Sequence, residues 1–145
     1  MEVNFNIALE KEIKSRYGDQ VEVYNPCNNM EINDKSEYAD AVMIANADNE
    51  RLEKTDLLLA LLDGPVIDAG LASEIGYFYG MKKPILALYS DSRQGGLTKE
   101  KVAALHEVAE SQFSYVNLYT IGIIKNRGTV VKTTEELINK IGDYL

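Results

Sequence analysis

The segment that decides the fold is Asp56-Leu-Leu-Leu-Ala-Leu-Leu-Asp-Gly-Pro-Val-Ile-Asp-Ala-Gly-Leu-Ala-Ser-Glu-Ile-Gly76. After Asp56 it continues with an apolar run over residues 57–62, which is typical of a strand buried on both faces of a parallel sheet. Gly64-Pro65 ends this strand, and residues 69–81 have a helical pattern. A buried strand that leads through a short turn into a helix is the building unit of α/β proteins.

The rest of the chain continues this alternation. A second buried strand is predicted over residues 84–89, and residues 21–24 alternate like a short strand. Helical patterns cover residues 4–16, 38–45, roughly 49–55, 98–111 and 133–145. This order predicts an α/β doubly wound fold, a flavodoxin- or Rossmann-like parallel sheet flanked by helices, in one domain over residues 1–145.

The composition narrows the classes of function. With 23 acidic and 15 basic residues the net charge is −8, which disfavours binding to nucleic acid or to an anionic membrane. One cysteine cannot form an internal disulfide, so a cytoplasmic protein is expected. One histidine leaves little scope for zinc sites or Cys–His pairs. Acid–base chemistry would therefore use carboxylates and tyrosines.

Glu74 is the only charged residue between residues 69 and 81. A helix that is apolar on all sides is expected to be buried on all sides, against the sheet and against another subunit. A lone carboxylate in that setting is a candidate functional group, whereas a partly solvated outward position is the alternative. Asp68 fits a helix N-cap as well as a ligand-binding residue, and Asp63 fits a turn ahead of Gly64.

Asp68, Gly70 and Glu74-Ile75-Gly76 resemble the hallmark of the nucleoside 2-deoxyribosyltransferase family. In that family an Asp follows a buried strand and precedes a Gly and a Glu-Leu/Ile-Gly on the next helix. An upstream family Asp matches Asp48, and a downstream Asn-Leu that reaches the site of a neighbouring subunit matches Asn117-Leu118. The Lys83-Pro84 and Asp91-Ser92-Arg93 segments are also similar, so that the resemblance covers most of the chain.

The N-terminus departs from the fold and from the family. Doubly wound proteins usually open on a strand that becomes central in the sheet, whereas this sequence opens on a helical pattern. Family members open with a strand that ends in an aromatic-Ala-Gly-Pro-like loop. In the predicted sheet, no strand is available for the position between the strands at residues 21–24 and 56–62. We therefore expect that an N-terminal strand is missing and that the chain begins at an internal methionine.

The resemblance implies that the protein transfers a 2-deoxyribosyl group between nucleobases, and that this reaction requires no metal or cofactor. Glu74 would be the nucleophile that forms a glycosyl ester, and Asp48 or Asp68 would protonate the leaving base. The residues implied in substrate binding are Asp63, Gly64, Gly70 and Asn117. Asn117 would come from a neighbouring subunit, so that the protein would be a homo-oligomer acting on nucleosides and nucleobases.

Two other functions stay open. The first is hydrolysis of 2′-deoxynucleoside 5′-monophosphates, in which water replaces the acceptor base. Near the motif only Ser73 and Arg93 could hold the phosphate of such a substrate. The second is a non-catalytic nucleotide-binding domain on the same fold.

Overall fold

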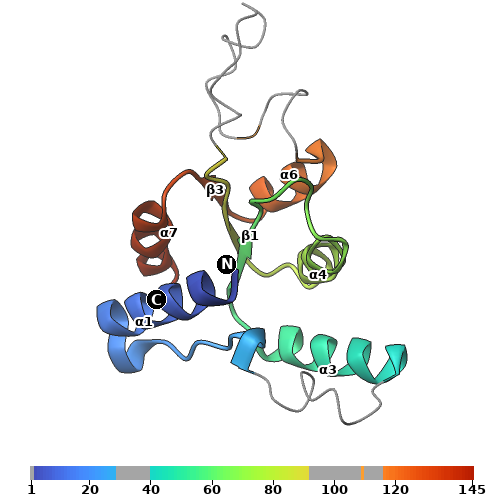
Figure 1. Cartoon of the computed structure of the whole chain (residues 1–145), viewed down its shortest axis with the longest axis horizontal. Helices are drawn as coiled ribbons and strands as arrows, with labels where there is room; N and C mark the ends of the chain where they lie inside the picture. The colour runs from blue at the N-terminus through green and yellow to red at the C-terminus, as the bar shows by residue number, and fades with distance from the viewer. Residues whose placement is uncertain (1, 29–39, 92–108, 110–115) are drawn as a thin grey trace, which may run out of the picture. The chain divides into compact units, whose positions relative to one another are not determined.

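The computed structural model describes residues 2–28, 40–91, 109 and 116–145 (Figure 1). The chain divides into two compact units, residues 1–50 with Leu145 and residues 51–144. In the part of the chain that is described, no helix has the length and apolar character needed to cross a membrane.

A three-stranded parallel sheet forms the centre of the second unit. Its order is β1 (Leu58–Leu61), β2 (Ile85–Leu88) and β3 (Thr129–Val131). Ala60 of β1 lies opposite Ala87 of β2, which lies opposite Val130 of β3. Every residue of β2 is buried, as its apolar sequence predicts for the central strand of a parallel sheet.

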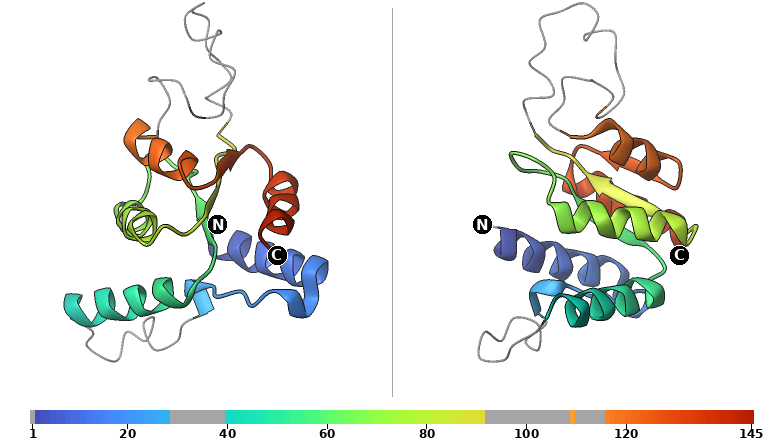
Figure 2. Two further views of the ribbon diagram at one scale, coloured as in Figure 1. Left: turned by 180° about the vertical axis from the view of Figure 1, so that it is seen from behind. Right: turned by 90° about the vertical axis from the view of Figure 1, so that its right-hand side faces the viewer.

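Helices cover both faces of this sheet (Figures 1 and 2). On one face α4 (Ala69–Gly80) contacts β1 and β2, and α6 (Leu118–Lys125) contacts β2 and β3. On the other face α7 (Thr134–Ile141) contacts β2 and β3. This confirms the prediction of an α/β fold with a parallel sheet flanked by helices.

Several predicted elements differ from those observed. Residues 21–24 belong to no strand, because an alternating pattern indicates extended backbone but supplies no pairing partner. The sheet instead contains β3, which the sequence analysis missed because three residues are too short to show a period. Residues 41–45 and 49–54 of two separately predicted helices belong to one helix, α3 (Ala41–Lys54). Except for Ala109, the predicted helix 98–111 lies outside the described residues.

The strand expected beside β1 is not among the described residues. Within the described residues, β1 pairs with β2 on one side and has no neighbouring strand on its other side. The expectation of an additional N-terminal strand stays a prediction.

The last turn of α3 is held against the end of α4 in the second unit. The Lys83 ammonium donates to the backbone oxygens of Glu53 at 2.6 Å and Thr55 at 2.7 Å. The Tyr77 hydroxyl donates to Glu53 Oε1 at 2.7 Å, and this bond raises the pKa of Tyr77 because it stabilises the neutral phenol. These contacts fasten the segment that leads into β1.

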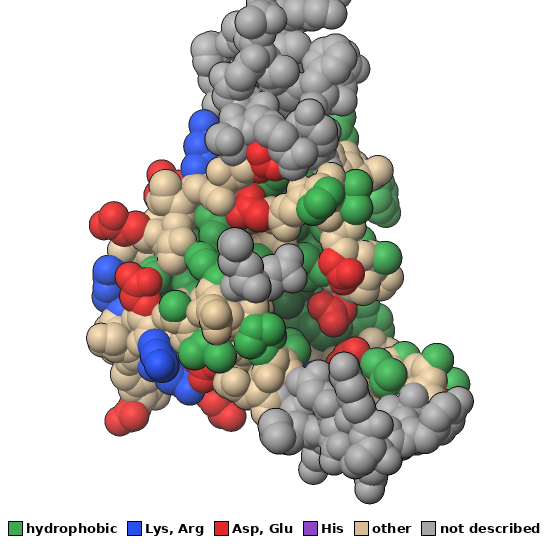
Figure 3. Space-filling model, viewed as in Figure 1, with side chains coloured by type: hydrophobic (Ala, Val, Ile, Leu, Met, Phe, Trp, Pro, Cys, Tyr) green, Lys and Arg blue, Asp and Glu red, His purple; other side chains and the backbone are tan. Residues whose placement is uncertain are grey.

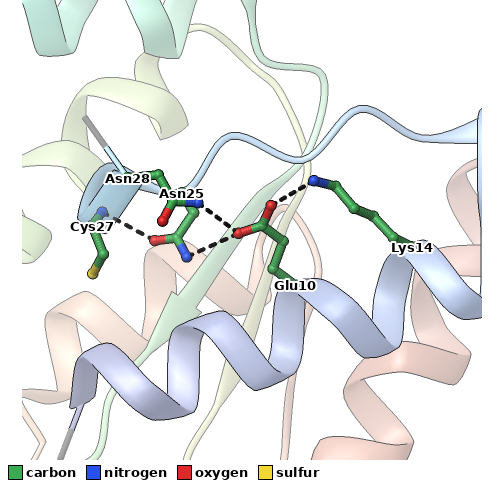
Figure 4. Close-up of polar contacts among 5 residues, drawn as sticks. All are labelled: Glu10, Lys14, Asn25, Cys27 and Asn28. Atoms are coloured by element: carbon green, nitrogen blue, oxygen red, sulfur yellow. Dashed lines mark hydrogen bonds and ion pairs between the residues drawn. The ribbon is translucent and has the colours of Figure 1, made fainter. Parts of the chain in front are cut away.

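In the first unit, a carboxylate on α1 (Glu2–Tyr17) binds side chains of the loop that follows this helix. Glu10 accepts hydrogen bonds from Lys14, from Asn25 Nδ2 at 3.1 Å and from Asn28 Nδ2 at 3.0 Å (Figure 4). The bonds from Lys14 and Asn25 hold the pKa of Glu10 below its usual value. The loop after α1 is therefore tied back to the helix most strongly at pH values where Glu10 is ionised.

Gly128 provides a test of the β2–β3 pairing. A Cβ atom at this position would lie 1.8 Å from the carbonyl oxygen of Ile85, so that Gly128→Ala must push β3 away from β2. We expect Gly128→Ala to lower the free energy of unfolding by about 3 kcal/mol or more, measured by urea denaturation.

Gly122→Ala is the matched control. Nothing lies within 4 Å of a Cβ at Gly122, and alanine is the better helix former, so this variant should be at least as stable as the wild type. Equal stability of the Gly128→Ala protein would contradict the close approach of the two strands.

Candidate active site

The carboxyl ends of β1 and β2 lie at one edge of the sheet, because the two strands are parallel. The backbone pairing continues just beyond the strands, where Leu62 N donates to Leu88 O at 2.9 Å and Tyr89 N to Val131 O at 2.9 Å. Open α/β sheets bind their ligands outside this edge. The segment from Asp63 to Asp68 leaves the sheet here and leads into α4.

Asp68 caps α4, as one of its two interpretations predicted. Its Oδ1 accepts a hydrogen bond from Leu71 N at 2.9 Å, and its side chain is exposed. A Cβ at Gly70 would lie 3.0 Å from this same oxygen, so a larger residue would crowd the capping carboxylate. The cap thus gives a physical reason for the Asp-x-Gly spacing of the motif.

Glu74 lies on α4 and is half-buried. The helix is anchored by Ile75 and Phe78, whose side chains are fully buried in the core. In the single chain another face of the helix is exposed: Gly70, Ser73, Gly76, Tyr77 and Gly80. These residues are mostly small and present little apolar surface to water. The exposed face of α4 can therefore lack charged side chains without being buried. The expected burial of α4 against the core is observed, and its expected burial against another subunit stays a prediction.

Asn117 caps α6 in the way that Asp68 caps α4. Its Oδ1 accepts from Tyr119 N at 2.9 Å and Thr120 N at 3.3 Å, and Asn117 is exposed. Each of the two helices leads into a strand of the same parallel sheet, so both begin at the carboxyl edge. Their caps therefore bring Asp68 and Asn117 to the same edge of the second unit.

Asp48 belongs to the first unit. It lies on α3 and is half-buried. Leu52, one turn later on the same helix, is buried in the core of the second unit. Ser92 and Arg93 lie outside the described residues.

Asp63 has a partner that the sequence analysis did not single out. Both of its carboxylate oxygens accept from Ser90, Oδ1 from the backbone N–H at 2.7 Å and Oδ2 from the hydroxyl at 2.7 Å. The two residues are far apart in sequence, and only the register of β1 against β2 shows that they meet. Gly64 follows with a φ of 142°, a conformation that favours glycine.

The described surface agrees with the acidic composition. Asp and Glu side chains are spread over the face in Figure 3 among exposed apolar ones. No group of three His, Cys, Asp or Glu residues that could hold a metal ion is found in the parts of the chain that the structure describes.

Solved structures resemble this chain over its full length. A conserved protein from Enterococcus faecalis V583 is 50% identical, with a TM-score of 0.83 over 98% of this chain and 89% of that one. The CMP N-glycosidase BcmB from Clostridium botulinum is 16% identical, with a TM-score of 0.52 over 100% of this chain and 95% of that one, which shows a shared fold. No curated protein gives a significant match.

The family model for nucleoside 2-deoxyribosyltransferase matches residues 6–135. This stretch runs through both compact units and includes Asp48, Asp68, Glu74 and Asn117. The chain therefore belongs to the nucleoside 2-deoxyribosyltransferase family.

Proposed function

We propose that the protein cleaves the N-glycosidic bond of 2′-deoxynucleosides and transfers the deoxyribosyl group to another base, with Glu74 as the nucleophile. The observation that carries this proposal is the arrangement of α4 in a chain of this family. Its N-terminus, capped by Asp68, lies at the ligand-binding edge of the sheet, and Glu74 is its only charged residue. Cleavage builds positive charge on the C1′ carbon, and a nearby carboxylate stabilises that charge.

The reaction has two balanced steps. In the first, the bond from C1′ to the base nitrogen breaks, its electron pair leaves with the base, and a Glu74 oxygen bonds to C1′. A carboxyl group supplies the proton that the leaving base takes up. In the second step a nitrogen of the incoming base attacks C1′, its proton returns to that carboxylate, and Glu74 is released. Asp48 and Asp68 are the two candidates for the proton donor.

The substrate would lie against the N-terminal end of α4. We assign sugar or base contacts to Gly64 and Gly70, which have no side chain to block the approach of a ligand, and to Asn117. Cap formation uses Asn117 Oδ1, so the side-chain NH₂ group can donate to a ligand.

We assign Asn117 to the site of a second copy of the chain, so that the enzyme is a homo-oligomer. The exposed small residues of α4 would allow a second subunit to approach closely. Tyr119 and Leu118, beside Asn117, are 76% and 42% exposed and would be covered by such contact. Because Cys27 is unpaired, we place the enzyme in the cytoplasm.

The first test is base exchange. The protein is incubated with deoxyinosine and adenine, and the products are separated by chromatography. Deoxyadenosine is expected from the wild type. Glu74→Gln, which keeps the size of the side chain, should reduce its formation by about a thousandfold or more.

Glu135→Gln on α7 is the control, since Glu135 is an exposed carboxylate on the opposite face of the sheet. Free deoxyribose without deoxyadenosine would show a hydrolase instead, and a monophosphate substrate would then be tested because BcmB is a CMP N-glycosidase. A Glu74→Gln protein with more than a tenth of wild-type exchange would contradict the nucleophile assignment.

The second test concerns Asn117. Asn117→Asp keeps an oxygen for the cap of α6 and removes the NH₂ donor, so we expect a folded protein of low activity. If each site of a dimer combines Glu74 of one chain with Asn117 of the other, refolding a mixture of Glu74→Gln and Asn117→Asp chains creates intact sites. About a quarter of wild-type exchange should return, because half of the dimers are mixed and each has one intact site.

No return of activity on mixing would show that Asn117 serves its own chain. A compact monomer in sedimentation at micromolar concentration would contradict the oligomer itself.

A further inference from the structure

We infer that Asp63 is a positioning residue, which orients the loop from β1 to α4 by binding Ser90 and thereby sets the direction in which α4 presents Glu74. This inference rests on the proposed function. It differs from the role in substrate binding that the sequence suggests, because both carboxylate oxygens of Asp63 are engaged by Ser90 at 2.7 Å.

The bond to Ser90 replaces a step of the β-ladder. In the β1–β2 pair, backbone bonds run from Leu58 N to Pro84 O at 3.2 Å and from Leu62 N to Leu88 O at 2.9 Å. In a parallel ladder of this register the next N–H, that of Ser90, would donate to Leu62 O. It donates to the Asp63 side chain instead. The Asp63 carboxylate therefore accepts the hydrogen bond of the Ser90 N–H, while the backbone after Leu62 turns out of the sheet.

The geometry after Asp63 depends on that turn. Gly64 adopts a φ of 142°, and only a few residues separate it from Asp68, the cap of α4. Because the loop is short, a shift of Asp63 at its beginning would also shift the start of α4. Two short bonds to a carboxylate, one of them from a backbone N–H, are of the stronger charge-assisted kind.

The bonds lie at the surface, because Asp63 and Ser90 are both exposed. Their loss should therefore disturb the loop more than the global stability of the chain. A misplacement of the reacting groups by about 1 Å costs up to roughly a hundredfold in rate. The expected signature of Asp63 is thus a fall in kcat without a matching loss of stability.

The experiment compares Asp63→Ala, Asp63→Asn and Ser90→Ala in the base-exchange assay. Asp63→Ala should lower kcat by about tenfold to a hundredfold, with the urea midpoint close to that of the wild type. Asp63→Asn should stay within about threefold of the wild type, because its amide oxygen still accepts from Ser90 N and its NH₂ group donates to the hydroxyl. Ser90→Ala, which loses one of the two bonds, should fall between them.

Amide hydrogen exchange supplies a readout that does not need activity. The Ser90 amide should exchange faster in Asp63→Ala than in the wild type, and Asp63→Asn should restore its protection. If Asp63 acted on the substrate as a carboxylate, Asp63→Asn would be as impaired as Asp63→Ala and Ser90→Ala would be fully active. That pattern, or an unchanged Ser90 amide in Asp63→Ala, would overturn the inference.

Failure of the inference and failure of the proposed function are distinguishable. An inactive Asp63→Asn together with an inactive Glu74→Gln would reject the positioning role and keep Glu74 as the nucleophile. A wild-type chain that cleaves no nucleoside would reject the function and with it the role of Asp63 in presenting a nucleophile.

Discussion

The parallel pairing of Leu58–Leu61 with Ile85–Leu88 is the constraint on which the rest of the second unit depends. Parallel strands need crossover helices, and each crossover brings a helix N-terminus to the carboxyl edge of the sheet. Among the described residues, two helices that begin there have a side-chain cap, Asp68 on α4 and Asn117 on α6. Polar side chains are therefore found at this edge because residues that cap the N-termini of helices are polar, and these N-termini follow the ends of the strands.

Residues of the candidate site have structural tasks in addition to the chemical tasks that we propose for them. Asp68 satisfies the first turn of α4 with one oxygen, and Gly70 leaves room for that carboxylate. Glu74 follows on a helix anchored by two buried neighbours, Ile75 and Phe78, which keep its backbone in place. In the proposed reaction, a fixed backbone at this position would help to hold the Glu74 carboxylate where charge develops on the sugar.

The sequence predicted the elements whose signals are local. The apolar runs predicted β1 and β2, and the helical pattern with Asp68 as a candidate N-cap predicted the start of α4, since these signals depend on neighbouring residues alone. Residues 21–24 show the limit of such patterns, because extended backbone becomes a strand only where a partner exists. β3 was missed because Thr129–Val131 is brief, and the Asp63–Ser90 pair because it depends on the register of two strands. The candidate site was predicted through the family resemblance, because composition alone left Glu74 between a functional and a solvated role.

The central claim is that a Glu74 oxygen bonds to the sugar, and trapping that ester tests it most directly. The wild type would be mixed with a deoxynucleoside in the absence of any acceptor base, quenched rapidly in acid and mapped by peptide mass spectrometry. One 2-deoxyribosyl group on the peptide that contains Glu74, lost again when a free base is added before the quench, is the predicted result. The same adduct on Asp48 or Asp68, or base exchange without any adduct, would contradict it.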